Sequence, residues 1–162
     1  MSPNTILLAQ QLGDILKAKA WQITCAESCT GGGIGYAITE ISGSSKWFER
    51  GFITYSNQAK QDMLGLSPII LDDFGAVSIQ TVAAMATGAA QTAGAQCAIA
   101  VSGIAGPDGG SADKPVGTVC FAFAVQQQLL TEKRHFIGER QQVRQQAVDY
   151  GLSRMCTLLK QT

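Results

Sequence analysis

The sequence predicts a single α/β domain over residues 1–162, with helices on both faces of a mixed, mostly parallel sheet that includes an antiparallel hairpin. The length of 162 residues is that of one domain. A hydrophobic fraction of 46% and a charged fraction of 15% are typical of globular proteins. Apolar runs of strand length alternate with segments of helical periodicity, which favours this three-layer α/β/α arrangement.

The chain begins with a predicted helix, strand and helix. Leucine and isoleucine recur at helical spacing over residues 5–20, which predicts an amphipathic helix. The apolar run 21–26 predicts a short strand. The segment 26–36, "AESCTGGGIGY", is then interpreted as a tight turn that opens a helix ending near Ile41.

A polar, glycine-bearing loop at 42–51 separates this helix from a second strand, which the aromatic and β-branched run 52–56 predicts. A short helix is expected over 58–64. Its start and end signals are Ser56 or Asn57 as the cap, and Gly65 and Pro68 as terminators.

The second half of the chain begins with a helix near the potential cap Ser78, followed by a strand over 97–106 that is apolar enough to be buried on both faces. After a long loop at 106–117, residues 118–125 and 129–137 are expected to form a hairpin around three glutamines. A closing helix has an inner stripe at Val143, Ala147, Gly151, Leu152, Met155 and Leu159. Binding sites in such sheets gather beyond the carboxyl ends of the strands, which predicts that the loops after Ala26, Tyr55 and Ser102 converge.

Composition excludes several functional classes. Twelve basic residues balance twelve acidic ones without a basic run, so we expect no nucleic-acid partner. The five cysteines contain no C-x-x-C pair, which indicates neither a disulfide framework nor a metal cluster. The N-terminal segment lacks a signal peptide or spanning run, so we expect a cytoplasmic protein without a membrane partner.

Ser28 is a candidate nucleophile. A serine on a turn between a buried strand and a helix has its hydroxyl projecting and backbone amides nearby, which can stabilise an oxyanion. The glycines at 31–33 allow a ligand to approach the main chain. A structural cap is the alternative interpretation, because any strand–helix turn favours the same residues. The adjacent Cys29 is either a packing residue or a thiol nucleophile.

A nucleophilic serine needs a base, and the chain contains one histidine, His135, which is expected to face solvent on a strand. The alternative is Lys60, whose pKa must fall far below about 10.4 to serve as a base. A first-turn position and burial would both lower that pKa. Tyr55 could hydrogen-bond the amine or relay a proton. The alternative interpretation is that Lys60 is a solvated lysine and Tyr55 a core tyrosine, neither with a catalytic role.

Other motifs give weaker signals. The S-x-x-K spacing at 111–114 lies in a glycine and proline loop and is treated as accidental. The glycine pattern matches neither a dinucleotide fingerprint nor a P-loop. The loop 102–110 could form an anion-binding nest or be a flexible surface loop. Arg140 and Arg144 share one helix face and would suit phosphate, or be simply solvated.

Five segments together resemble the CinA C-terminal domain family: "AESCTGGG", "GSSKWFERGFITYSNQAK", "GAVS", "SGIAGPDGGSADKPVGTV" and "GERQQVR". The resemblance covers roughly Leu12 to Leu158, in the same order. Stand-alone family members are nicotinamide-mononucleotide deamidases of the PncC type. Larger members carry an additional N-terminal domain with a pyrophosphatase activity, which is not expected here.

The resemblance implies a Ser/Lys amidohydrolase that converts nicotinamide mononucleotide and water to nicotinate mononucleotide and ammonia, in pyridine nucleotide recycling. The family's nucleophile maps onto Ser28, its base onto Lys60 and its assisting tyrosine onto Tyr55. No metal or cofactor is expected. The expected substrate-binding or oxyanion residues are Cys29, Thr30, Gly31, Gly32, Ser102, Gly103, Ile104, Gly106, Arg140 and Arg144.

Two other functions stay open at this point. One is a non-catalytic pyridine-nucleotide sensor that uses the same pocket, and the other is an amidase for a different small amide. A homodimer is expected, because a 17.0 kDa sheet protein has apolar surface to cover, and because the resemblance implies one.

Overall fold

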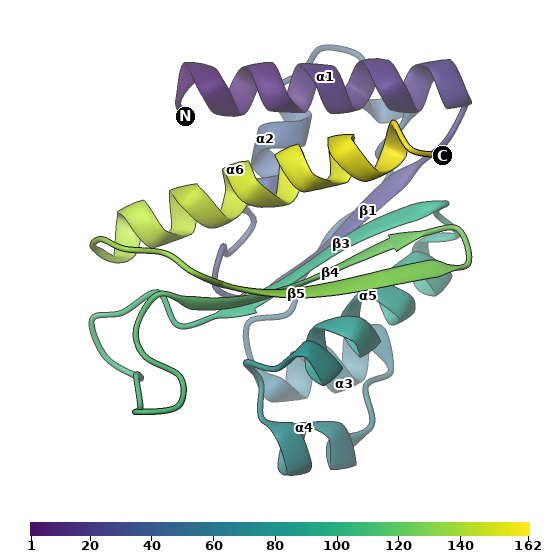
Figure 1. Cartoon of the computed structure of the whole chain (residues 1–162). Helices are drawn as coiled ribbons and strands as arrows, with labels where there is room; N and C mark the ends of the chain where they lie inside the picture. Colours follow the sequence, from purple (N-terminus) through teal and green to yellow (C-terminus); the bar gives the residue numbers. More distant parts are fainter.

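The computed structural model describes residues 1–162 and contains one five-stranded mixed sheet between two layers of helices (Figure 1). The strand order is β2-β1-β3-β4-β5. Strand β1 pairs in parallel with β2 and β3, whereas β3–β4 and β4–β5 are antiparallel. The strands are β1 (Ile23–Glu27), β2 (Phe52–Ile53), β3 (Cys97–Gly103), β4 (Thr118–Val125) and β5 (Gln128–His135).

Helices cover both faces of the sheet, as Figure 1 shows. One layer contains α1 (Pro3–Lys19), α2 (Gly33–Thr39) and α6 (Arg140–Leu159). The other contains α3 (Asn57–Leu64), α4 (Pro68–Phe74) and α5 (Ile79–Ala93). A 3₁₀ helix, η1 (Ser44–Lys46), lies between α2 and β2 in the sequence. The predicted three-layer fold with a mixed sheet is confirmed. The sheet is not mostly parallel as expected, because two of its strand pairs are parallel and two are antiparallel.

The core has two parts, one on each face of the sheet. Alternate side chains of β3 point to opposite faces, so Ile99 and Val101 pack with α1, α2 and α6, while Ala98 and Ala100 face α5. The alanine side chains on the second face are small, so α5 can pack close to the sheet. At Gly88 of α5, an added Cβ would overlap the carbonyl oxygen of Leu64 at the end of α3.

The expected end of the short helix is confirmed at Gly65, which ends α3 in a left-handed conformation, but the role expected of Pro68 is wrong. Pro68, interpreted as a second end signal, begins α4 as its first residue. Proline fits this position because the first helical residue has no intrahelical partner for its N–H. Strand β2 is also shorter than the predicted 52–56, because the chain leaves the sheet after Ile53 and Ser56 caps α3.

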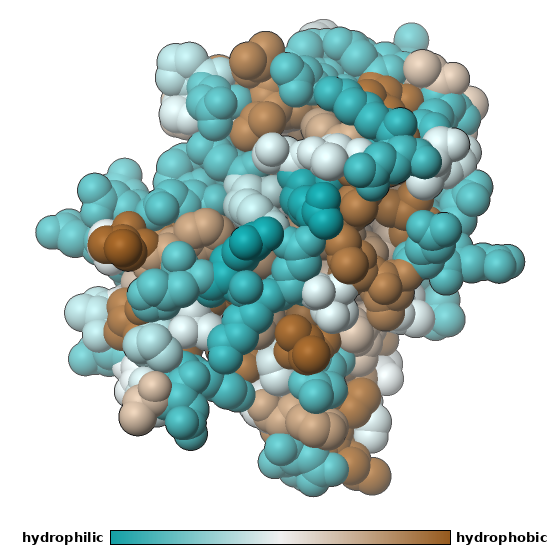
Figure 2. Space-filling model, viewed as in Figure 1, coloured by the Kyte–Doolittle hydropathy of each residue, from teal (hydrophilic) through white to brown (hydrophobic).

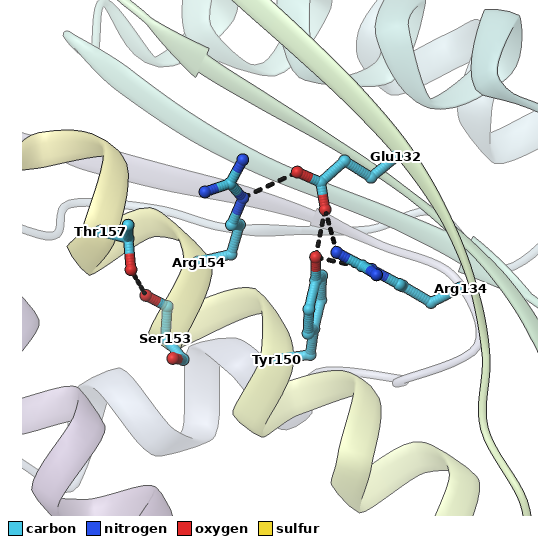
Figure 3. A network of polar contacts seen from close by, with 6 residues as sticks. All are labelled: Glu132, Arg134, Tyr150, Ser153, Arg154 and Thr157. Atoms are coloured by element: carbon cyan, nitrogen blue, oxygen red, sulfur yellow. Dashed lines mark hydrogen bonds and ion pairs between the residues drawn. The ribbon is translucent and has the colours of Figure 1, made fainter. Parts of the chain in front are cut away.

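The surface mixes apolar and polar side chains, as the space-filling view of one face shows (Figure 2). No helix has the length and apolar character that crossing a membrane requires. The edge strand β5 is attached to α6 by a polar network around Glu132 (Figure 3). Arg154 Nε donates to Glu132 Oε1 at 2.7 Å, and Tyr150 and Arg134 donate to its other oxygen.

Candidate active site

The carboxyl end of β1 brings Ser28 to Lys60 of α3. The distance from Lys60 Nζ to Ser28 Oγ is 3.2 Å, although 32 residues separate the two in sequence. Ser28 is 8% exposed and Lys60 only 1%. The Ser28 amide donates to Val101 O at 3.0 Å, which fixes the start of the turn against β3. The sequence therefore identified a pair that the fold places in hydrogen-bonding contact.

Lys60 lies in a pocket of oxygen acceptors. Its Nζ also contacts Thr54 O at 2.9 Å and Ser56 O at 3.5 Å, and no carboxylate is paired with it. Ser56, one of the two caps considered, is the N-cap of α3, so Lys60 is the fourth helical residue. Burial lowers the pKa of the Lys60 amine below its ordinary value, because a buried charge loses its hydration.

The turn after Ser28 is built around Glu27, a residue that the sequence analysis did not single out. Glu27 is 1% exposed, and five donors surround its carboxyl group. They are the hydroxyl of Thr30 at 2.6 Å, the amides of Gly32, Ile34 and Gly35 at 3.1, 3.0 and 2.8 Å, and the thiol of Cys25 at 3.4 Å. An acidic residue between an apolar strand and a glycine-rich turn is the sequence signal that could have revealed it.

Only some of the turn's amides are free to bind a ligand. The amides of Gly31 and Gly32, which were expected to bind substrate or an oxyanion, donate to Ser28 O and to Glu27. The amides of Cys29 and Thr30 donate to no protein atom. Positive φ angles of 59° and 94° at Gly31 and Gly32 explain the glycines, since other residues rarely adopt them.

Cys29 is a poor thiol nucleophile. Its side chain is 6% exposed, and burial raises the pKa of the thiol to about 12. A thiolate is therefore disfavoured, and the packing role is the one that the structure supports.

Tyr55 lies beside Arg140 rather than beside Lys60. Arg140 Nη2 donates to the Tyr55 hydroxyl at 3.0 Å, and Arg140 Nη1 donates to Gly106 O at 2.9 Å. The phenol ring is 60% exposed and makes no hydrogen bond to the Lys60 amine. The expected contact between Tyr55 and the amine is absent, because Tyr55 follows the end of β2 with its side chain directed outward.

Arg144, one turn after Arg140, contacts the serine turn directly. Its Nε donates to Cys29 O at 3.1 Å, and its Nη2 donates to Thr30 O at 2.8 Å. The two arginines share one face of α6 as expected, but each has its own partners.

An open cavity of about 1050 Å³ lies between the loop after β3 and the start of α6. Residues 105–107, Val116, residues 138–142 and Arg144 line it. Ser28 is not part of this lining. The cavity reaches the serine turn through Arg144, and it reaches Tyr55 through Arg140.

The expected residues at the end of β3 have different environments. Ser102 is 1% exposed. Gly103 packs against β4, where an added Cβ would lie 2.7 Å from Val119 Cγ2. Ile104 forms backbone hydrogen bonds with Thr118 and Gly117, and Gly106 lines the cavity.

Three further features considered in the sequence do not form a functional site. His135 is exposed at the end of β5. Ser111 and Lys114 form a local turn in which the Ser111 hydroxyl accepts from the Lys114 amide, and the Lys114 amine donates to Phe74 O. No group of three metal-binding side chains lies together.

Fold and site together define an α/β protein in which a serine hydroxyl lies in hydrogen-bonding contact with a buried lysine amine. Comparison with known proteins gives the family. The model of the CinA C-terminal domain matches residues 6–159, and the chain belongs to that family.

Its relatives include enzymes named for one activity. A "Nicotinamide-nucleotide amidohydrolase PncC" of Enterobacter agglomerans is 58% identical over 146 residues, covering 90% of this chain and 89% of the relative. The PncC of Escherichia coli K12 is 53% identical over 146 residues, covering 90% and 88%. The crystal structure of the competence/damage inducible protein CihA from Agrobacterium tumefaciens is 42% identical, with a TM-score of 0.94 and coverage of 99% and 98%.

Proposed function

We propose that this chain hydrolyses the carboxamide of nicotinamide mononucleotide to nicotinate mononucleotide and ammonia. The names of its relatives support this substrate, and their coverage extends over nearly the whole chain. The observation that carries the proposal is the 3.2 Å contact between the Lys60 amine and the Ser28 hydroxyl in a buried setting.

The surroundings of Lys60 suit a neutral amine that acts as a base. A neutral amine has two N–H groups and one lone pair. Thr54 O and Ser56 O can accept the two N–H groups, which leaves the lone pair for the proton of the Ser28 hydroxyl. The lowered pKa increases the fraction of enzyme that holds this form at neutral pH.

In the proposed reaction, Lys60 takes the Ser28 proton while Ser28 Oγ bonds to the carboxamide carbon. The carbonyl oxygen becomes negative and is held by the amides of Cys29 and Thr30, which have no other partner. The Lys60 ammonium then gives its proton to the amide nitrogen as the C–N bond breaks, so the nitrogen leaves as ammonia and Ser28 stays acylated. Lys60 next deprotonates a water that attacks the ester carbon, and the Lys60 ammonium returns this proton to Ser28 Oγ as the ester bond breaks, which releases nicotinate mononucleotide.

The cavity beside the serine turn is proposed to hold the ribose and phosphate. Arg140 is the proposed phosphate ligand, since its guanidinium lines the cavity and is fixed by Gly106 O and Tyr55. Tyr55 is then proposed to orient Arg140 rather than to relay a proton. A role in pyridine nucleotide recycling and a cytoplasmic location are part of the same proposal.

The test is ammonia release from nicotinamide mononucleotide by the wild type and by Ser28→Ala and Lys60→Met. Each variant should lose turnover by at least about 10³-fold, because nucleophile and base act as a unit. Arg154→Lys, on α6 but outside the site, is the control and should keep wild-type activity.

The choice of substrate decides between the proposal and its rivals. A phosphate-binding site should give a higher kcat/KM for the mononucleotide than for nicotinamide riboside or nicotinamide. Tight binding of the mononucleotide without turnover by the wild type would instead indicate a sensor. Faster turnover of a different small amide would indicate a different amidase.

A further inference from the structure

The turn after Ser28 has two free amides, and the direction of each is set by the carbonyl of its own peptide unit. A trans peptide is planar, with its C=O and N–H pointing in opposite directions. The carbonyl of Ser28 belongs to the same unit as the Cys29 amide, and the carbonyl of Cys29 to the same unit as the Thr30 amide. Whatever holds those two carbonyls therefore aims the two free donors.

The two carbonyls have different partners. Ser28 O accepts from the Gly31 amide at 3.0 Å, a bond within the turn itself. Cys29 O accepts from Arg144 Nε at 3.1 Å, a bond from a helix that lies 115 residues away in sequence. The direction of the Thr30 amide thus depends on α6.

Arg144 holds the next carbonyl as well. Its Nη2 donates to Thr30 O at 2.8 Å, so the guanidinium grips two successive carbonyls with a planar fork. On the other side of the turn, Glu27 accepts from the Thr30 hydroxyl and from the Gly32 amide. Carboxylate and guanidinium together fix Thr30 by its side chain and by the carbonyls before and after its amide.

We propose that Arg144 is a positioning residue, which acts with Glu27 to hold the Thr30 amide in place for the developing oxyanion, and that it is not the phosphate ligand. This inference rests on the proposed function, because the oxyanion is that of the amide hydrolysis. The two arginines of α6 then have separate roles. Arg140 binds the phosphate, and Arg144 positions a donor for the reacting carbonyl.

The test compares Arg144→Lys with the wild type on two substrates, nicotinamide mononucleotide and nicotinamide riboside, which lacks the phosphate. Lysine keeps the charge but cannot hold two carbonyls with a planar fork. We expect kcat to fall by about 10²-fold on both substrates, with KM within about threefold of the wild type, because an oxyanion donor acts mainly in the transition state. Arg154→Lys is the matched control on the same helix and should change neither constant.

A second measurement does not depend on the substrate. A fluorophosphonate probe phosphonylates an activated serine and places a polar P–O group where the oxyanion forms. We expect Arg144→Lys to slow labelling of Ser28 by about tenfold or more, because the P–O group uses the same donors as the oxyanion. Added ethylguanidinium should restore part of the labelling rate of Arg144→Ala, which loss of folding would not permit.

The outcomes distinguish two roles of Arg144, which are positioning the Thr30 amide and binding the phosphate. A loss confined to the phosphorylated substrate, with normal labelling, would overturn the proposal and make Arg144 a phosphate ligand. Unchanged kinetics and labelling would also overturn it. If the wild type labels at Ser28 but releases no ammonia from either substrate, the proposed function fails, and the labelling rate of Arg144→Lys still decides the positioning role.

Discussion

The amine of Lys60 is buried among carbonyl and hydroxyl oxygens, without a carboxylate to balance a positive charge. Burial lowers its pKa, and the neutral form is the one that can accept a proton from Ser28. We therefore expect kcat/KM to rise with pH as Lys60 loses its proton, and to level off above that pKa. The rise should lie below about 10.4, where an ordinary lysine titrates.

The measurement is a pH–rate profile of ammonia release, in which kcat/KM reports groups of the free enzyme. Lys60→Met should remove the rise together with most of the activity. An activity that falls as pH increases from 6 to 9 would contradict a lysine base.

Glu27 is expected to contribute strongly to stability. Glu27→Gln keeps the shape of the side chain but replaces one acceptor oxygen by a donor that faces other donors. Leaving buried donors without an acceptor should cost about 3 kcal/mol, which lowers Tm by roughly 6–12 °C in a domain of this size.

Thermal unfolding of the purified variant measures this loss. The matched control is Glu40→Gln at the end of α2, where the side chain is exposed and the change should stay within about 0.5 kcal/mol. Equal Tm values for Glu27→Gln and the wild type would show that the carboxyl group does not hold the turn.

For single residues, the sequence predicted which residues belong to the site better than it predicted the contacts that they make. Ser28 and Lys60 were nominated from a turn and a helix start, and both lie in the predicted elements. The partner of Tyr55 could not be predicted, because Arg140 reaches it across 85 residues of sequence. The role of Glu27 was not predicted, because its five hydrogen-bond donors come together only when the glycine-rich turn folds around its carboxyl group.

Among the elements, the contact between α3 and α5 controls where Lys60 lies. A Cβ at Gly88 would overlap the carbonyl oxygen of Leu64, which follows Lys60 by one helical turn. Gly88→Ala should therefore push α3 away from α5. Overpacking typically costs about 1–3 kcal/mol, and we expect kcat to fall as well, because the amine moves relative to Ser28.

Gly151→Ala in α6 is the matched control. Its added Cβ would meet neighbours at 3.5 Å or more, so the gain in helix propensity of up to about 1 kcal/mol should dominate. Denaturant unfolding and ammonia release, measured on both variants, check the pair. A Gly88→Ala protein as stable and active as Gly151→Ala would show that the overlap relaxes without moving α3.

The elements differ in how well the sequence predicted them. The bounds of β4 agree with the apolar run 118–125, and Ser78 caps α5 as expected, because these signals are local. Helix α4 was missed, since a proline was interpreted as an end signal although it also starts helices. Strand β2 was overestimated, because its residues have strand-forming side chains but only two of them pair.

For the whole molecule, the expected homodimer stays a prediction. Several large apolar side chains are exposed, among them Tyr36, Ile53, Tyr55 and Ile137, and burying such groups drives association. Light scattering on the eluted protein should give twice 17.0 kDa, or about 34 kDa, if the dimer forms. A mass of 17.0 kDa across the micromolar range would contradict it.

The layer arrangement was predicted for the whole chain, because alternation of strands and helices restricts the possible topologies. The strand order required the structure, since no sequence signal states that β3 lies between β1 and β4. That order brings the ends of β1 and β3 together, and Ser28 N donates to Val101 O as a result.

Ser28 follows β1 and Lys60 lies in α3, with all of α2 and β2 between them in the sequence. Neither the turn after β1 nor the helix alone contains both groups, so recovered enzyme activity during refolding would mark the moment at which α3 docks. Circular dichroism would follow the formation of helices in the same sample. A delay between the formation of helices and the recovery of activity would give the time that the docking of α3 requires.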